Sequence, residues 1–169
     1  ATYLPVIANE IEGAFMAQHL WSLLGVGAIV SCFLWLYFQS KWGTLSALIA
    51  NLISQSSFVF ISYFSHIEIL LIISALGVGL TFMGTTVLVM TLAKQTQSPK
   101  WLNLLGLVTL SYSIGQILGP LLTNKIQRTT GAIDFALLLA GFALLVAAFI
   151  VIYYRFKALK PLNKSDIPV

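Results

Sequence analysis

The stretch 132–154, AIDFALLLAGFALLVAAFIVIYY, decides the fold class of this chain. It holds one charged residue, Asp134, near its start, and every later residue is apolar, small or aromatic. At 1.5 Å per residue, a helix of this length crosses the roughly 30 Å hydrocarbon core of a bilayer. Backbone polar groups in lipid must be satisfied within the segment, so the run predicts a transmembrane helix.

Four similar runs precede it, each separated from the next by a short polar stretch. They predict membrane-spanning helices at residues 18–39, 44–65, 68–93 and 101–123. Ahead of them, Pro5 and the apolar residues 6–8 predict the last turns of a further helix. We therefore expect an all-α integral membrane fold with five complete transmembrane helices and the end of a sixth. Its predicted parts are a truncated helix end with an external loop (1–10), a five-helix bundle (11–154) and a basic cytoplasmic tail (155–169).

Composition supports this assignment. Of 169 residues, 59% are hydrophobic and 8% charged, whereas soluble domains average about 45–50% and about 25%. Nine basic and five acidic side chains are too few to cover a soluble globule of this length. The composition excludes a soluble enzyme, a nucleic-acid-binding domain and a disordered tail, and it makes the lipid bilayer the first expected partner.

The positions of the basic residues predict the orientation. One side of the membrane receives seven of the nine: Lys41, Lys94, Lys100, Arg155, Lys157, Lys160 and Lys164. Lys125 and Arg128 fall on the opposite side. Basic loops stay cytoplasmic, so we expect an external N-terminus, a cytoplasmic C-terminus and a location in a bacterial inner membrane.

Three stretches carry a resemblance to a known family. They are TYLPVIA at 2–8, TFMG at 81–84 and GQILGPLL at 115–122. The chain is similar to major facilitator superfamily transporters, and within them to the poorly characterised YbfB/YjiJ-type branch. The resemblance extends to about residue 155 and aligns the chain with the second half of such a protein, from the end of helix 7 to helix 12.

The resemblance implies a secondary transporter that moves a small solute by alternating access between two six-helix bundles. It also implies a partner outside this sequence, either an N-terminal six-helix half or a second subunit, as in a half-size transporter that dimerises. The cytoplasmic turn motif of the family is degraded at 36–44, where only Lys41 and Gly43 match. The charge network of that motif is therefore not expected in this half.

The span at 101–123 carries the strongest polar stripe. Thr109, Ser113, Gln116 and Pro120 follow one another at helical spacing, and Tyr112 lies four residues before Gln116. Gly115 and Gly119 form a small-xxx-small pair that lets a neighbouring helix approach, and Pro120 frees a backbone carbonyl. Two interpretations stay open: a packing seam between helices, or a substrate pathway that includes Tyr112 and Gln116, since helix 11 of the resembled fold lines the pathway.

The span at 68–93 combines small and hydroxyl residues in a similar way. Gly77 and Gly84 predict close packing and local bending, and Thr81 and Thr85 are candidate pathway residues because helix 10 of the resembled fold moves and lines the cavity. Plain packing is the alternative for both threonines. Trp35, on the first complete span, is a candidate bulky wall of the same cavity.

Catalytic and cofactor sites are not expected. No predicted span places a charge near its centre, no Ser–His or paired-acid arrangement occurs at helical spacing, and the lone Cys32 lies in an apolar run. A competing hypothesis makes the protein a non-transporting membrane subunit or assembly factor. In that case the polar face of the second span, with Asn51 and Gln55, would bind a partner helix. The alternative is that this face packs inward on the spans at 18–39 and 132–154.

Overall fold

A computed structural model describes residues 4–64, 68–96, 102–130 and 134–159. All regular structure in these ranges is helical: α1 (Leu4–Trp42), α2 (Thr44–Phe64), α3 (Glu68–Gln95), α4 (Leu104–Thr130) and α5 (Asp134–Leu159). Each of the five contains a segment long and apolar enough to cross a membrane. The all-α membrane fold predicted from the sequence is thereby confirmed.

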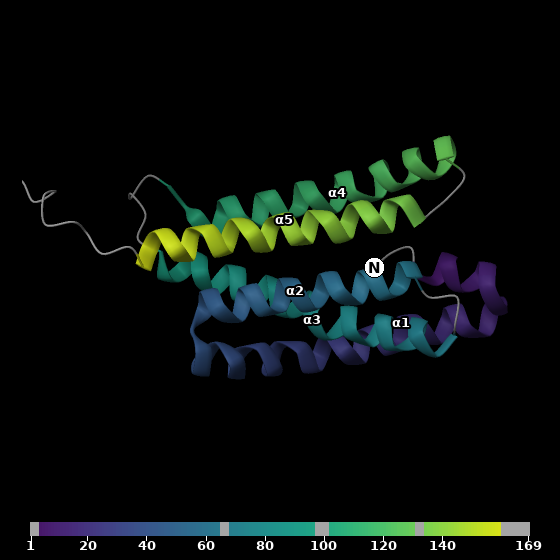
Figure 1. Cartoon of the computed structure of the whole chain (residues 1–169), viewed down its shortest axis with the longest axis horizontal. Helices are drawn as coiled ribbons and strands as arrows, with labels where there is room; N and C mark the ends of the chain where they lie inside the picture. Colours follow the sequence, from purple (N-terminus) through teal and green to yellow (C-terminus); the bar gives the residue numbers. More distant parts are fainter. Residues whose placement is uncertain (1–3, 65–67, 97–101, 131–133, 160–169) are drawn as a thin grey trace, which may run out of the picture.

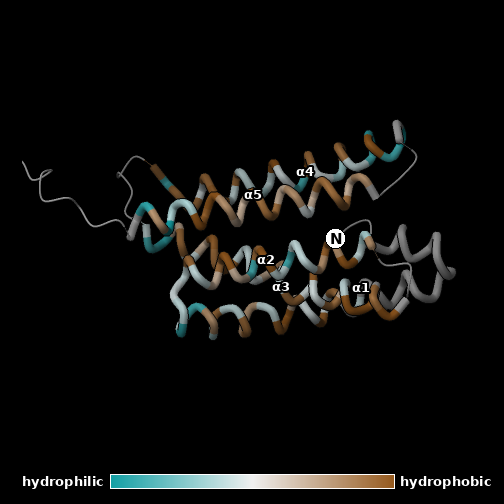
Figure 2. The backbone as a smooth tube through the Cα atoms, viewed as in Figure 1, coloured by the Kyte–Doolittle hydropathy of each residue, from teal (hydrophilic) through white to brown (hydrophobic). Residues whose placement is uncertain are grey.

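The helices form a bundle in which α1, α2, α3 and α5 each pack closely on at least one neighbour, whereas α4 makes few contacts (Figure 1). α1 packs mainly on α3, and α2 lies against both α3 and α5. α4 touches α3 and α5 only sparsely, and none of its membrane-spanning segment is buried. Figure 2 shows hydrophobic residues along the length of the helices and hydrophilic ones gathered mostly at their ends, as a bilayer requires.

The close contact between α1 and α3 depends on glycines. A methyl group added at Gly79 would lie 2.6 Å from the carbonyl oxygen of Leu24, and one added at Gly27 would lie 3.0 Å from the Leu76 oxygen. Both neighbours are backbone atoms, which cannot rotate away. Membrane helices associate through such close packing because lipid supplies no hydrophobic driving force between them.

Gly43 separates α1 from α2. Its φ of +80° places it in the left-handed region, which glycine adopts without steric cost. The Gly43 N–H donates to the Gln39 carbonyl oxygen at 2.9 Å, and the Gly43 carbonyl accepts from the Ala47 N–H at 3.0 Å. One residue therefore ends the first helix and begins the second.

Several helix ends lie away from the predicted boundaries. α1 is helical from Leu4 and so includes the predicted loop before residue 18, although Figure 1 shows its first turns, in purple, running in another direction from the rest. α4 continues through residues 124–130, which the sequence assigned to a loop, and α5 extends to Leu159. In these extensions, helix-forming residues carry the backbone beyond the apolar segment, and hydropathy does not mark where they stop. The division of the chain at residues 10 and 154 stays a prediction.

Candidate functional site

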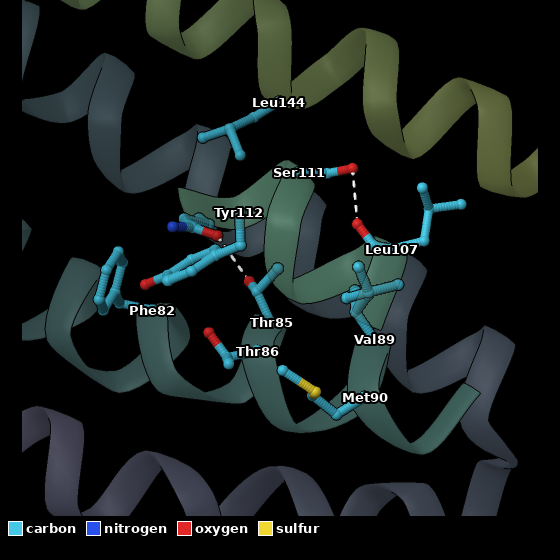
Figure 3. A pocket seen from close by; sticks show the side chains of 11 residues that line it. Phe82, Thr85, Thr86, Val89, Met90, Leu107, Ser111, Tyr112 and Leu144 are labelled. Atoms are coloured by element: carbon cyan, nitrogen blue, oxygen red, sulfur yellow. Dashed lines mark hydrogen bonds between the residues drawn. The ribbon is translucent and has the colours of Figure 1, made fainter. Parts of the chain in front are cut away.

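A cavity of about 480 Å³ lies between α3 and α4 (Figure 3). Its size falls within the range of small-molecule pockets. α2 contributes one residue to its wall and α5 another, while α3 and α4 supply the rest. The lining residues are Gln55, Phe82, Thr85, Thr86, Val89, Met90, Leu107, Val108, Ser111, Tyr112 and Leu144.

The wall is mainly apolar, with a few uncharged polar groups. Charged side chains with a described environment, such as Lys41, Lys94 and Arg155, are exposed, and none lines this cavity. In Figure 3 the Tyr112 side chain reaches from α4 across to Phe82 of α3. An ion entering the cavity would lose its hydration without gaining a counter-charge, so the site suits a neutral molecule.

A short hydrogen-bond relay crosses from α2 to α3 beside the cavity. Asn51 Nδ2 donates to Thr85 Oγ1 at 2.8 Å, and Thr85 Oγ1 donates to Gln55 Oε1 at 2.9 Å. Asn51 is fully buried, and Gln55 is 9% exposed. The Thr85 hydroxyl also lies 3.2 Å from the Thr81 carbonyl oxygen. This relay fixes which end of the Gln55 carboxamide faces Thr85.

The relay satisfies Asn51 only in part. Its Nδ2 group donates to Thr85, while its buried Oδ1 has no partner among the described residues. An unpaired buried polar group costs about 1–3 kcal/mol, so this oxygen offsets part of the stability that the relay contributes.

Four serine and threonine hydroxyls of α4 donate hydrogen bonds to backbone carbonyls of the same helix. Thr109 donates to the Leu105 carbonyl at 2.8 Å and Ser113 to the Thr109 carbonyl at 2.9 Å, and Ser111 and Thr123 bond the carbonyl four residues earlier in the same way. Gln116 differs because its exposed carboxamide makes no such bond. Pro120 has no N–H to give to the Gln116 carbonyl in the usual helical pattern. Within residues 109–120 of α4, the Gln116 carboxamide and the Tyr112 hydroxyl therefore lack a described hydrogen-bond partner.

In α3, backbone groups of Leu80 and Gly84, which are one helical turn apart, form hydrogen bonds with side chains of another helix. The Gly84 N–H donates to Ser31 Oγ at 2.8 Å, and the Leu80 carbonyl accepts from Trp35 Nε1 at 2.8 Å. Both partners come from α1. The two backbone groups that would normally bond each other thus have side-chain partners, which lowers the cost of bending α3 here.

The structure brings some of the predicted pathway residues together and separates others. Thr85 and Tyr112 line the cavity. Thr81 is buried behind it, with its hydroxyl bonded to the Gly77 and Val78 carbonyls, and Trp35 is buried against Gly84. Gln116 lies on the exposed surface of α4 outside the lining. A pathway role for these five residues stays a prediction.

The predicted packing glycines also separate into two groups. A methyl group would overlap the Phe58 ring at Gly77 and the Trp35 ring at Gly84, so both glycines sit in tight contacts. At Gly115 and Gly119 it would meet nothing within 4 Å. Any helix that packs on this pair of α4 glycines lies outside the described part of the chain.

The residues matching the family's cytoplasmic turn lie in a neutral environment. Lys41 stacks over the Tyr37 ring, with Nζ 4.7 Å from its centroid, and Gly43 forms the turn. Beside them, Thr44 Oγ1 donates to Gln95 Oε1 at 2.8 Å, linking the start of α2 to the end of α3. Here an uncharged hydrogen bond joins the helix ends.

The interpretation of the α2 polar face as a partner-binding surface is wrong for its two largest members. Asn51 and Gln55 point into the bundle and bond Thr85, because a carboxamide facing lipid would lose its hydrogen bonds. Sequence reasoning also missed Gln55 as a cavity residue, together with Phe82, Met90 and Ser111. Helical spacing placed Gln55 on one face with Asn51 but gave no sign of which helix that face meets.

Five helices long and apolar enough to cross a membrane define an integral membrane protein, and its cavity between α3 and α4 is lined by uncharged residues. A family model described as "Uncharacterised MFS-type transporter YbfB" matches residues 1–152. The chain therefore belongs to this family of major facilitator transporters, as the sequence resemblance indicated. No curated protein and no solved structure gave a significant match.

Proposed function

We propose that the protein is a secondary transporter that moves a small neutral solute across a bacterial inner membrane by alternating access. In this proposal the five helices belong to the second bundle, with the C-terminus cytoplasmic. A further bundle, from the same polypeptide or a second subunit, faces α4. The solute passes along the surface between the bundles, and Thr81, Thr85, Tyr112, Gln116 and Trp35 contribute to its pathway or its walls.

The observation that carries the proposal is the exposure of α4. This helix is apolar enough to span the membrane, yet none of its spanning segment is buried. It also presents the Gln116 carboxamide, which no described residue satisfies. An amide in contact with lipid costs free energy, whereas one facing a water-filled pathway or a second bundle does not.

The hydrogen bonds of the Leu80 and Gly84 backbone with α1 support the movement that alternating access requires. Side chains of α1 bond both backbone groups there, so each keeps a hydrogen-bond partner when α3 bends. Thr85 and Thr86 follow directly and line the cavity. Bending of α3 at Gly84 would therefore change the shape of the cavity.

Cysteine accessibility tests the proposal without knowledge of the solute. Cys32 is the only cysteine of the chain, and its replacement by serine, together with that of every cysteine elsewhere in the full-length protein, gives a background for single cysteines. In membrane vesicles of both orientations, we expect Gln116→Cys to react with a membrane-impermeant maleimide from at least one side. Phe149→Cys is the control, because Phe149 is 69% exposed on α5 and should face lipid.

The side or sides from which Gln116→Cys reacts then decide whether the proposal holds. Reaction at Gln116→Cys from both sides, with none at Phe149→Cys, supports alternating access. Reaction from neither side, with the protein folded, means that the α4 face is closed to water. In that case the transport pathway proposed along α4 is wrong.

A further inference from the structure

We propose that the cavity between α3 and α4 selects neutral, mainly apolar molecules that carry a hydrogen-bond acceptor, and that the Gln55 carboxamide recognises this acceptor. This inference rests on the proposed function, since it names the class of solute for the same protein. It concerns a residue of α2 that makes up part of the cavity wall.

The first step is the state of the Gln55 side chain. Its Oε1 accepts the Thr85 hydroxyl, which turns the oxygen toward α3. Its Nε2 bonds no described residue, and it is absent from the fully buried unpaired atoms of the described chain. An amide nitrogen that is neither paired nor sealed in protein, on a residue lining a cavity, is a donor open to that cavity.

The second step is the relay that holds this orientation. Asn51 Nδ2 donates to the Thr85 oxygen, which leaves the Thr85 proton for Gln55. Rotating the Gln55 carboxamide would turn Nε2 toward the Thr85 oxygen and would exchange the 2.9 Å bond to Oε1 for the longer 3.2 Å contact of the Thr85 hydroxyl with the Thr81 carbonyl oxygen. Asn51 and Thr85 therefore act as positioning residues, and Gln55 presents donors rather than an acceptor.

The third step is the inventory of the remaining polar groups. Ser111 has given its proton to the Leu107 carbonyl. The hydroxyls of Thr86 and Tyr112 bond no described residue and can donate or accept. Ser111 is therefore left able only to accept, and Gln55 is the one open lining group that can only donate, so it selects for acceptors such as a carbonyl oxygen.

The apolar part of the wall sets the rest of the chemistry. Phe82, Val89, Met90, Leu107 and Leu144 supply aromatic and aliphatic contacts. No charged side chain stands among the lining residues to pair with an ion. A ring or chain bearing a carbonyl group fits both requirements.

Benzophenone tests the proposal because it is neutral and apolar, carries one carbonyl, and on ultraviolet excitation attaches to nearby C–H bonds. We expect peptide mass spectrometry of the irradiated full-length protein to find the adduct at Met90, with saturable dependence on concentration. Benzanilide, which has an amide carbonyl, should compete. 1,1-Diphenylethylene has the shape of benzophenone with a CH₂ group in place of the oxygen and should compete poorly.

The variants distinguish loss of ligand recognition by Gln55 from a general disturbance of the protein structure. Gln55→Leu removes the donor and should raise the half-saturating benzophenone concentration about three- to tenfold, the effect of one net hydrogen bond. Gln55→Met is a second variant of similar length in case the first does not fold. Gln127→Leu is the matched control, since it removes a carboxamide of α4 that does not line the cavity and should leave labelling unchanged. Thr85→Val should weaken labelling, and it should add little in the Gln55→Leu background.

Three results would overturn the inference. They are no saturable label at Met90, equal labelling of wild type and Gln55→Leu, or equal competition by benzanilide and 1,1-diphenylethylene. The outcome is independent of the cysteine test of transport. Selective labelling with an inaccessible Gln116→Cys would keep the recognition and remove the transport pathway, and the opposite pair of results would do the reverse.

Discussion

The contact of α1 with α3 at Gly79 yields the sharpest prediction about stability. Alanine at this position places a methyl carbon 2.6 Å from the Leu24 carbonyl oxygen, whereas ordinary contact begins at 3.4 Å. Because the obstacle is backbone, the two helices must separate locally by about 0.8 Å. A gap of that size forfeits a quarter to a half of the dispersion attraction across the contact.

The same displacement strains two hydrogen bonds on this interface. Both the Trp35–Leu80 and the Ser31–Gly84 bonds measure 2.8 Å, so an added 0.8 Å takes them beyond useful length. Overpacking costs about 1–3 kcal/mol, and each membrane hydrogen bond contributes about 0.6–1.7 kcal/mol. We therefore expect Gly79→Ala to lower the free energy of unfolding by about 2–6 kcal/mol relative to a glycine replaced in open space.

Gly25→Ala supplies that reference. It makes the same chemical change and brings the same gain in helix propensity, but its methyl group meets nothing within 4 Å. Reversible unfolding of the full-length protein in mixed micelles of mild detergent and dodecyl sulfate measures both variants. Equal stabilities for Gly79→Ala and Gly25→Ala would refute the close backbone contact between α1 and α3.

Three further predictions concern single side chains, each measured by the same unfolding assay. Trp35→Phe removes the donor to the Leu80 carbonyl and should lower the free energy of unfolding by about 1–2 kcal/mol. It should also speed hydrogen exchange of the Gly84 amide, and unchanged exchange would contradict a weakened turn there. Asn51→Leu loses one hydrogen bond but also removes the unpartnered Oδ1, so its free energy of unfolding should lie within about 1 kcal/mol of wild type. A loss above about 3 kcal/mol would contradict the relay as described. Cys32→Ser should change stability by less than about 0.5 kcal/mol, because the half-buried Sγ lies only 3.9 Å from the Ala28 carbonyl, to which serine can bond in turn.

The sequence predicted the membrane-spanning segments well because lipid imposes a simple condition on them. A run such as 132–154 has no alternative to a helix in a bilayer, and α5 is the helix found there. The ends were harder to predict. Residues 124–130 are polar yet helical, since water at the membrane surface tolerates both a loop and a continuing helix.

The candidate site was predicted only in part, because hydropathy does not fix the rotation of a helix about its axis. Thr85 and Tyr112 were proposed for the pathway and both line the cavity. For Gln55 and Asn51 the sequence left inward packing and a partner-binding surface open, and the structure shows them bonded to Thr85 of α3. Glycine spacing shows the same ambiguity: Gly84 is packed against Trp35, while Gly115 faces open space.

The polar stripe of α4 can now be divided by a physical criterion. A hydroxyl that bonds the carbonyl four residues earlier has met its donor requirement within the helix, so Thr109 and Ser113 are compatible with lipid as well as with water. A carboxamide has two donors and an acceptor and cannot meet them in this way. The Tyr112 hydroxyl also bonds no described residue, but Tyr112 lines the cavity between α3 and α4, whereas Gln116 lies outside it. Gln116 therefore distinguishes a lipid-facing α4 from one that faces water or a second bundle. The two interpretations of this helix, packing seam and pathway, differ in the environment of the Gln116 side chain.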